Sequence, residues 1–242
     1  MSKHPLPLLL SALLPLVASA APPARPAAVR PTARPAGATS VAAPVPPDPR
    51  VLMQTSMGRI VLELYPQKAP KTVANFLRYV HDGFYPGTVF HRVIKGFLVQ
   101  GGLYTSTLTA KRTRAPIAIE ANNGLSNLRG TVAAARAADP NSATAQFFIN
   151  LVDNPRLDFV SDQSGATWGY TVFGKVIQGM DVVDKIGDLP TAAQGPFTAD
   201  VPHPLPLIES VSVLPTDAPL PAATPAAATV KKPPPGKPAA RH

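Results

Sequence analysis

The sequence of 242 residues contains no cysteine. This absence excludes disulfide bonds, cysteine ligands for zinc and lipid attachment at a processed N-terminal cysteine. The fold must therefore be held by its core alone. Histidine is also scarce, and the five histidines are scattered, with no pair at the helical spacing of a metal site. We expect neither a metal nor a cofactor.

Two sequence motifs typical of common catalytic sites are missing too. The chain has no glycine-rich loop of the kind that cradles phosphates and no nucleophile elbow. No apolar run approaches the roughly 20 residues that span a bilayer. We therefore expect no integral membrane contact.

Proline is abundant but unevenly placed. Of the 31 prolines, 12 lie in residues 1–50 and 11 in residues 201–242. Segments rich in proline and alanine lack the large apolar side chains that could offset the entropy of ordering. We expect a disordered linker over residues 21–49, one folded domain over residues 50–214 and a disordered tail over residues 215–242.

The formal net charge of +9 suggests nucleic acid until it is divided along the chain. Residues 51–213 hold 14 Lys and Arg against 12 Asp and Glu, a net of +2. The remaining positive charge lies on the two ends, where spread-out charges attract anionic surfaces only weakly. The folded segment has no basic stripe with interleaved aromatics, so we expect no nucleic-acid partner.

The first 20 residues have the pattern of an export signal. Lys3 and His4 precede "PLPLLLSALLPLV", which has the length of a signal h-region, and the small residues "ASAA" follow. We predict cleavage after Ala20. The mature protein is then expected to be exported, with the periplasm favoured over the external medium. We expect it to be a monomer.

The middle segment reads mostly as strands. Residues 59–65 alternate apolar and polar side chains, and the turn "SMG" links them to residues 51–55 in a predicted hairpin. Further strands are predicted for the segments 90–102, 146–151 and 170–177.

Two segments have helical spacing. A helix is predicted from Pro70 to just before Gly83, with an apolar face formed by Val73, Phe76, Leu77 and Val80. A shorter helix is predicted over residues 179–187, with Met180, Val183 and Ile186 buried. The segment has many short predicted strands and two helices, and strands and helices do not alternate in a βαβ pattern. This arrangement favours an antiparallel barrel or sandwich.

Arg92 stands in the otherwise apolar stretch "FHRVIKGFLVQGG". Burying a guanidinium without a partner is costly. Either the side chain reaches solvent, or it is held beside apolar walls for a ligand outside the protein. One such arginine, a glutamine and many apolar residues suit a reaction that needs no nucleophile, base or metal.

Three segments resemble the cyclophilin family of peptidyl-prolyl cis–trans isomerases: "FHRVIKGFLVQGG", "GTVAAARAADPNSATAQFFINL" and "GYTVFGKVIQGMDVVDKI". They stand in the family's order, and "NNGLSNLRGT" and "DPNSATAQFF" are most like its exported bacterial branch. The resemblance implies a mainly β fold, an eight-stranded antiparallel closed β-barrel capped by two α-helices. It also implies isomerisation of X-Pro bonds in unfolded or partly folded proline-containing polypeptides, with no cofactor.

The resemblance implies a set of site residues as well. Arg92 would be the catalytic residue, facing a groove outside the barrel. Gln100 would orient Arg92 or bind the substrate backbone, and Gln146 would line the groove nearby. The proline pocket would be formed by Phe97, Leu98, Phe148 and Leu157, and further substrate-binding positions are His91, Tyr170 and the backbone of Ala135 and Arg136. Without the resemblance, the four apolar residues would be assigned to the core.

The chain departs from the family pattern in two places. Arg156 stands where the family usually has Trp or Phe, an aromatic residue associated with cyclosporin binding, so we expect weak cyclosporin affinity and an altered substrate preference. The segment 159–169 is longer and more polar than is usual. Its Trp168 either replaces the missing aromatic or packs on the barrel rim.

Three functions are therefore compared. An active isomerase for exported proteins is favoured because Arg92, Phe97, Gln100 and Phe148 are all present. The alternatives are a proline-binding chaperone or scaffold with low turnover, and a surface-associated protein that acts through its basic ends.

Overall fold

The computed structural model describes residues 47–215, 219 and 220. The predicted signal segment lies outside the described residues, as do most of the predicted linker and tail. Regular structure runs from Arg50 to Leu214.

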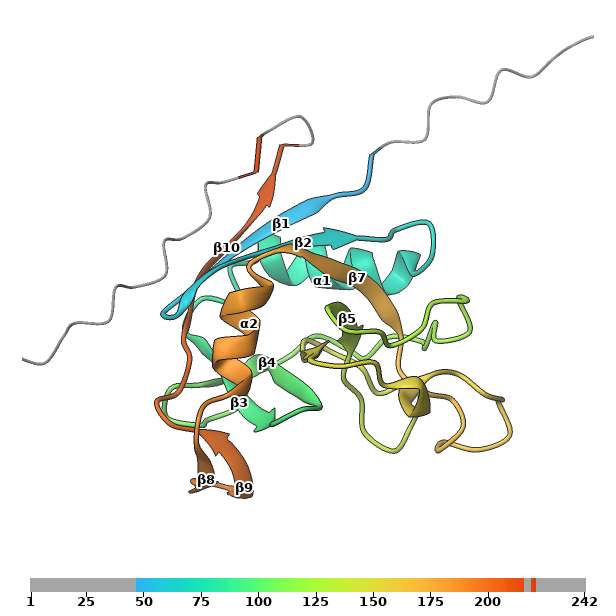
Figure 1. Cartoon of the computed structure of the whole chain (residues 1–242). Helices are drawn as coiled ribbons and strands as arrows, with labels where there is room; N and C mark the ends of the chain where they lie inside the picture. The colour runs from blue at the N-terminus through green and yellow to red at the C-terminus, as the bar shows by residue number, and fades with distance from the viewer. Residues whose placement is uncertain (1–46, 216–218, 221–242) are drawn as a thin grey trace, which may run out of the picture. The chain divides into compact units, whose positions relative to one another are not determined.

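The described residues form ten strands, two α-helices and one short 3-10 helix, η1. In chain order these are β1 (Arg50–Thr55), β2 (Gly58–Leu64), α1 (Pro70–His81), β3 (Thr88–Ile94), β4 (Leu98–Thr105), β5 (Thr131–Ala134), β6 (Phe147–Asn150), η1 (Pro155–Leu157), β7 (Val172–Gln178), α2 (Met180–Gly187), β8 (Thr191–Gln194), β9 (Phe197–Pro202) and β10 (Ile208–Leu214). Eight strands make one antiparallel sheet in the order β10-β1-β2-β7-β5-β6-β4-β3, while β8 and β9 pair separately (Figure 1).

The predicted hairpin and both predicted helices are confirmed. β1 and β2 pair across a turn at residues 56 and 57. α1 begins at Pro70, whose missing N–H costs nothing in a first helical turn, and ends before Gly83, which has a φ of 63°. Its apolar face is buried at Val73, Phe76 and Val80.

The segment 90–102, predicted as strand, is a hairpin in the structure. β3 ends at Ile94, and β4 begins at Leu98. Gly96 has a φ of 67° in the turn between them, a conformation that glycine adopts without the steric cost of a side chain. Apolar residues on both sides of the turn concealed it in the sequence.

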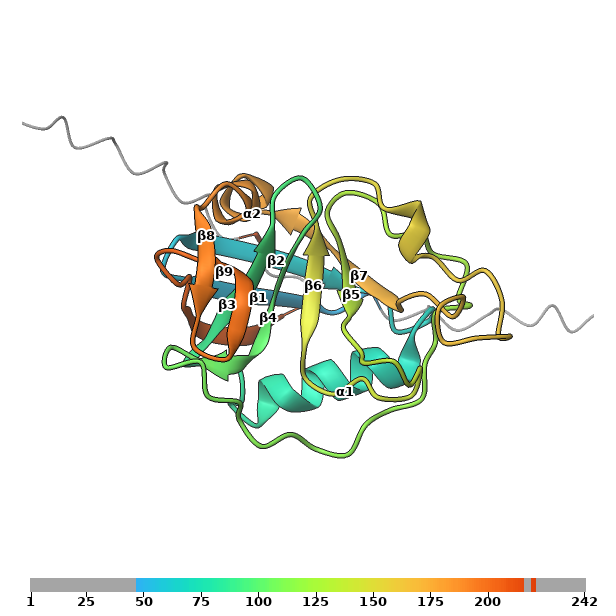
Figure 2. The same ribbon diagram turned by 90° about the horizontal axis from the view of Figure 1, so that it is seen from below.

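The predicted eight-stranded antiparallel sheet with two helices is confirmed, but the barrel is only partly closed. The edge strands β3 and β10 form no continuous ladder. Val89 bridges to Leu207, and the N–H of Phe90 donates to the Pro206 carbonyl at 2.9 Å. The sheet curls strongly, with α1 and α2 at opposite ends of it (Figure 2).

The inner face of the curled sheet holds the main core. Phe147 of β6 meets Phe76 of α1 edge-on at 5.8 Å and Tyr85 at 5.7 Å. Gly102 of β4 allows this packing, because a Cβ there would lie 2.8 Å from the Phe147 ring. The core thus joins α1 to the sheet and keeps the opposite face of the sheet free for a site.

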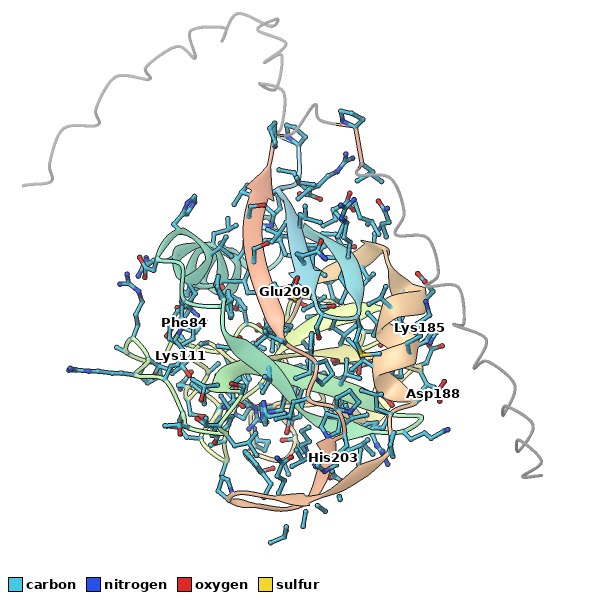
Figure 3. The ribbon with its side chains drawn as sticks, turned by 90° about the vertical axis from the view of Figure 1, so that its left-hand side faces the viewer. Phe84, Lys111, Lys185, Asp188, His203 and Glu209 are labelled. Carbon is cyan, nitrogen blue, oxygen red and sulfur yellow. The ribbon has the colours of Figure 1, made fainter. Side chains whose placement is uncertain are left out.

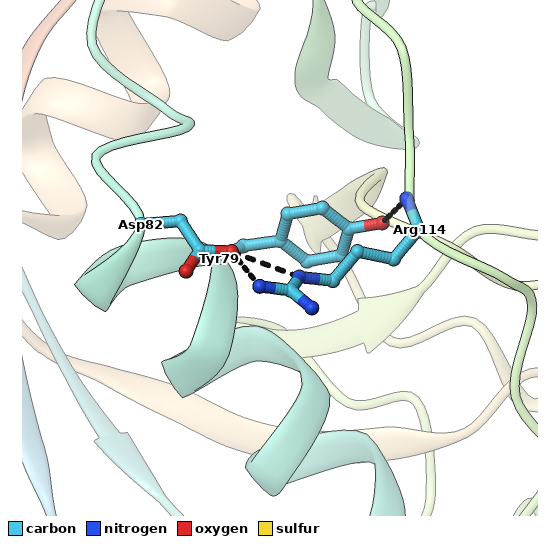
Figure 4. A network of polar contacts seen from close by, with 3 residues as sticks. All are labelled: Tyr79, Asp82 and Arg114. Carbon is cyan, nitrogen blue, oxygen red and sulfur yellow. Dashed lines mark hydrogen bonds and ion pairs between the residues drawn. The ribbon is translucent and has the colours of Figure 1, made fainter.

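Polar contacts fasten the long connection between β4 and β5 to the end of α1. The N–H of Arg114 donates to the Tyr79 hydroxyl, and its Nε donates to the Asp82 carboxylate, both at 2.8 Å (Figure 4). The Lys111 ammonium lies 4.6 Å from the centre of the Phe84 ring (Figure 3). The first half of this connection is therefore held beside the end of α1.

Candidate active site

A row of residues crosses the outer face of the sheet at one level. Arg92 of β3 is opposite Gln100 of β4, Gln100 is opposite Phe148 of β6, and Phe148 is opposite Ala133 of β5. Cross-strand partners share a face of the sheet. Side chains from four strands are thereby brought together without any loop.

Arg92 reaches this face because β3 contains a bulge. Residues two apart on a regular strand share a face. Yet Phe90 is fully buried in the core, whereas the Arg92 side chain is 44% exposed. The pairing with β4 shifts between these two residues, which leaves His91 as the extra residue. A bulge of this kind re-aims a side chain, and here it turns the guanidinium outwards while Val93 returns to the core.

The outer face has an apolar cluster of its own. On β6, Phe147 and Ile149 belong to the main core, while Phe148 between them points the other way and is 2% exposed. The cluster around Phe148 contains Leu98, Ala133 and Val172, with Phe97, Leu125, Ala135, Leu157 and Tyr170 packed against it. The outer face of the sheet therefore has a second buried apolar cluster, separate from the main core.

A pocket of about 190 Å³ opens on this cluster. It is lined by Arg92, Phe97, Leu98, Gln100, Ala135, Arg136, Phe148, Leu157 and Tyr170. Nine of the eleven residues predicted for the site thus lie around one cavity. The two that do not line it are His91 and Gln146.

Gln146 contacts the pocket through Gln100. The Gln100 side-chain amide donates to the side-chain oxygen Oε1 of Gln146 at 3.0 Å. The bond fixes the orientation of the Gln100 amide, which stands next to Arg92 in the cross-strand row. Gln146 itself lines a narrow neighbouring cavity together with Asn75 and Thr144.

His91 lies on the other side of Arg92, away from the pocket. Its ring is 2% exposed and packs against Tyr104 at 4.6 Å and Phe197 at 5.4 Å. The pKa of His91 is lowered to about 4, chiefly because the imidazole is buried; the hydrogen bond with the Val89 backbone opposes this shift and the Arg92 charge adds to it. His91 is therefore neutral at neutral pH and contributes packing behind the guanidinium.

Arg92 has an ion-pair partner that the sequence did not suggest. Its Nε lies 3.4 Å from a carboxylate oxygen of Asp200 on β9. The two residues are 108 positions apart, and no motif links them. The contact arises because the β8–β9 hairpin packs beside β3.

The comparisons with known proteins agree with this geometry. The family described as cyclophilin type peptidyl-prolyl cis-trans isomerase/CLD matches residues 50–213. The chain belongs to the cyclophilin family. Its activity is therefore the isomerisation of peptidyl-prolyl bonds, in proline-containing peptides or proteins.

Individual relatives and solved structures show how similar this cyclophilin is to known ones. It is 53% identical over 163 residues to peptidyl-prolyl cis-trans isomerase B of Escherichia coli, a match covering 67% of this chain and 98% of the relative. It is 52% identical over 164 residues to the isomerase cyp18 of Streptomyces antibioticus, covering 68% and 98%. A cyclophilin-type isomerase of Cryptosporidium parvum has a similar structure, with a TM-score of 0.58 and 27% identity over 69% of this chain and 98% of that one.

Arg156 covers one rim of the pocket in this cyclophilin. Its guanidinium lies over the Phe97 ring, 4.5 Å from the centre. Trp168, considered in the sequence as a replacement for the missing aromatic, does not line the pocket and instead meets Phe159 at 5.6 Å. A cation thus covers this rim of the pocket, and Trp168 does not take that place.

Arg136 covers the rim on the side of Tyr170. Its guanidinium lies 4.8 Å from the centre of that ring. It also donates to the carbonyls of Gly169 and Gly165, at 2.8 and 2.7 Å. Arg136 therefore fastens the long segment 159–169 to the pocket, a role of its side chain in addition to the backbone role that the sequence suggested.

Metal and membrane sites have no structural support in the described part of the chain. No group of three or more His, Asp or Glu side chains there is arranged to hold a metal ion. None of the helices described is long and apolar enough to cross a membrane.

Proposed function

We propose that Arg92 catalyses the isomerisation by donating a hydrogen bond to the prolyl nitrogen. The X-Pro bond rotates slowly because its C–N bond has partial double-bond character, with a barrier of about 18–20 kcal/mol. In the twisted transition state the nitrogen regains a lone pair. A guanidinium aimed at that lone pair gains its partner chiefly in the twisted state, so it lowers the barrier rather than only tightening binding.

The observation that carries this proposal is the place of Arg92 in the pocket wall. Its guanidinium stands at one end of a cavity whose floor is Phe148 and whose sides include Leu98 and Leu157. A cavity of about 190 Å³ accommodates a proline ring, and its apolar floor lies in the same site as the guanidinium. A structure of the Cryptosporidium relative was obtained in the presence of the dipeptide Ala-Pro.

The magnitudes show that Arg92 needs help from the pocket. An uncatalysed rate of roughly 10⁻² s⁻¹ and a turnover on the order of 10³ s⁻¹ differ by about 7 kcal/mol of barrier. A charge-assisted hydrogen bond contributes about 1.5–3 kcal/mol in proteins. Positioning of the proline by the apolar walls supplies the remainder.

We further propose that the substrates are exported polypeptides that are still folding. The support is the signal-like pattern of residues 1–20, followed by small residues at the predicted cleavage site. A monomer in the periplasm, without nucleic-acid or membrane contact, is the simplest form of this proposal. The N-terminal sequence of the protein from the periplasmic fraction should begin at Ala21, whereas an intact Met1 on cytoplasmic protein would contradict export.

The direct test of the mechanism is cis-to-trans isomerisation of a short Xaa-Pro peptide by the wild type and by Arg92→Ala. We expect kcat/KM to fall by about 10²-fold, because the hydrogen bond to the twisted state is lost. Arg112→Ala is the matched control, since Arg112 is an exposed arginine that does not line the pocket. Circular dichroism checks that each variant is folded.

The outcomes separate two functions. Loss of turnover in Arg92→Ala but not in Arg112→Ala supports the proposed mechanism. Full activity of Arg92→Ala would overturn the role of Arg92. A wild type that binds proline peptides but turns them over hardly faster than water would favour the proline-binding chaperone.

A further inference from the structure

Three arginines surround the proline pocket, and no acidic residue lines it. Arg92 and Arg136 are part of its wall, and Arg156 covers Phe97 at its rim. The rest of the lining is apolar apart from Gln100 and the Tyr170 hydroxyl. Low-dielectric walls strengthen the field of nearby charges. The mouth of the pocket is therefore positive although residues 51–213 carry a net charge of only +2.

Two of these cations have no carboxylate partner among the described residues. Every hydrogen bond of the Arg136 guanidinium goes to a backbone carbonyl, including that of Ala137 at 2.9 Å. The contact recorded for the Arg156 guanidinium is the face of the Phe97 ring. Carbonyl oxygens and ring faces orient a guanidinium but leave its full charge in place.

The carboxylates closest in sequence to these two arginines, and the one paired with Arg92, all bond to other groups. Asp139, three residues from Arg136, accepts from the N–H of Asn141 at 2.9 Å. Asp158 accepts two hydrogen bonds from Asn127, at 2.7 and 2.9 Å, and one from Ser126. Asp153 accepts from the N–H of Arg129 at 2.8 Å. Asp200 is paired with Arg92.

The position of Arg156 is built into the fold. It lies in η1, next to the buried Asn154, whose side-chain amide donates to the Phe97 carbonyl at 3.0 Å and to Asn150 at 2.8 Å. These bonds hold η1 against the β3–β4 turn. The guanidinium is thus presented at the rim by a fixed segment rather than by a loose surface side chain.

We propose that this pocket selects proline segments with an acidic side chain next to the proline, and that Arg156 is the residue that chiefly reads this charge. A carboxylate beside the bound proline would reach a guanidinium that is already aimed, stacked and without an anionic partner. The proposal rests on the proposed function, since it assumes that the proline binds in this pocket. It gives that function a substrate class: acidic X-Pro or Pro-X segments.

The expected preference is modest and depends on salt. Exposed ion pairs contribute about 0.2–1 kcal/mol, which corresponds to a factor of about 1.4 to 5 in kcat/KM. The Debye length falls from about 30 Å at 0.01 M salt to about 8 Å at 0.15 M, so the preference should weaken as salt is added. A preference that came from shape rather than charge would not respond to salt.

The test is the isomerisation of tetrapeptides with Glu, Gln or Lys placed directly before the proline, and of a second series with these residues directly after it. The wild type at low salt should show kcat/KM in the order Glu, Gln, Lys in at least one series, with Glu above Gln by a factor of about 1.4 to 5. The ratio of Glu to Gln should approach 1 in 0.5 M NaCl. Equal values for Glu and Gln in both series would overturn the proposal.

Two variants assign the preference to Arg156. The ratio of Glu to Gln should fall towards 1 in Arg156→Gln and should be retained in Arg156→Lys, which keeps the charge. Arg112→Gln removes one positive charge from elsewhere on the surface and should keep the wild-type ratio. An unchanged ratio in Arg156→Gln would overturn the role of Arg156.

Failure of this proposal differs from failure of the proposed mechanism. The mechanism is tested by the absolute turnover of a neutral peptide in Arg92→Ala. The acidic preference is tested by a ratio of two peptides within one variant. A wild type that turns over all peptides equally well would leave the isomerase intact and remove only the charge selection.

Discussion

His91 and Arg92 are adjacent residues with opposite surroundings. The bulge in β3 places the His91 ring between Tyr104 and Phe197, while the Arg92 guanidinium lies in the pocket wall. Protonation of His91 would put a buried positive charge next to the Arg92 guanidinium, which repels it. The fold therefore holds His91 in its neutral form.

The neutral His91 predicts how stability depends on pH. Its pKa is about 4 in the folded protein, against 6.5 for an ordinary histidine. Between these values the unfolded chain binds the proton more readily, so stability that is present above pH 6.5 is lost as the pH falls towards 4. We expect this residue to lower the free energy of unfolding by about 2 kcal/mol between pH 7 and pH 5.

Urea unfolding at pH 7 and pH 5, with the wild type and His91→Phe, measures this contribution. The phenylalanine keeps an aromatic ring against its two neighbours and cannot titrate. The variant should lose less stability than the wild type over this range. The same pH dependence in both proteins would show that His91 is not the titrating group.

At the scale of elements, the β8–β9 hairpin packs against β3, the strand that carries Arg92. It stands apart from the main sheet and packs on β3 through Phe197, whose ring lies 5.4 Å from that of His91. Asp200, on the same strand β9, has a φ of 66°, which is uncommon for a residue with a side chain. This backbone conformation accompanies a carboxylate that lies at the Nε edge of Arg92.

The ion pair predicts a positioning role for Asp200. Its partner atom is Nε, so the two terminal nitrogens of Arg92 are left for the substrate. We expect Asp200→Asn to lower kcat/KM for a neutral peptide by up to about fivefold, the range of an exposed pair, because the guanidinium loses its orientation. Asp200→Glu should recover part of the loss.

The matched control is Asp188→Asn. Asp188 also forms an exposed ion pair, with Lys95 at 3.1 Å in the turn between β3 and β4, but neither residue lines the pocket. Peptide turnover and thermal unfolding are compared for both variants. Equal turnover in Asp200→Asn, Asp188→Asn and the wild type would exclude a positioning role for Asp200.

The elements differ in how far the sequence predicts them. Local signals sufficed for α1, where Pro70, Gly83 and the apolar spacing between them all act within one segment. The turn at Gly96 was concealed because the apolar residues on its two sides face different clusters. The bulge at His91 follows from pairing with β4, and the contact with Asp200 follows from packing of a distant hairpin. Long-range contacts of this kind leave no periodic trace in a single sequence.

The site residues show the same division. Resemblance to a family identified nine residues that the structure places around one pocket. It could not give the direction of each side chain, so His91 was grouped with them although its ring packs behind Arg92. The sequence shows Arg156 as a departure from the family pattern. Its place over Phe97 depends on the hydrogen bonds of the Asn154 side chain, which are visible only in three dimensions.

At the scale of the whole molecule, the pocket uses a small part of the chain. All of its lining residues lie between Arg92 and Tyr170, on β3, β4, β6 and η1 and in the segments that follow β3 and β5 and precede β7. The described sheet and helices supply every side chain that the proposed mechanism requires. The proline-rich ends contribute most of the positive charge, because residues 51–213 have a net charge of +2 out of +9.

This division predicts that catalysis and surface binding separate on truncation. A chain of residues 47–215 should isomerise a short neutral peptide with kcat/KM within about twofold of the chain that begins at Ala21, since a short peptide contacts only the pocket. Retention on anionic vesicles at low salt should be strong for the longer chain and weak for the truncated one, because the electrostatic attraction falls with the positive charge that truncation removes.

A loss of turnover beyond tenfold on truncation, with the fold intact by circular dichroism, would mean that the ends take part in the reaction. Equal retention of both chains would instead place the anion-binding surface on the folded domain, where Arg136 and Arg156 are the first residues to test.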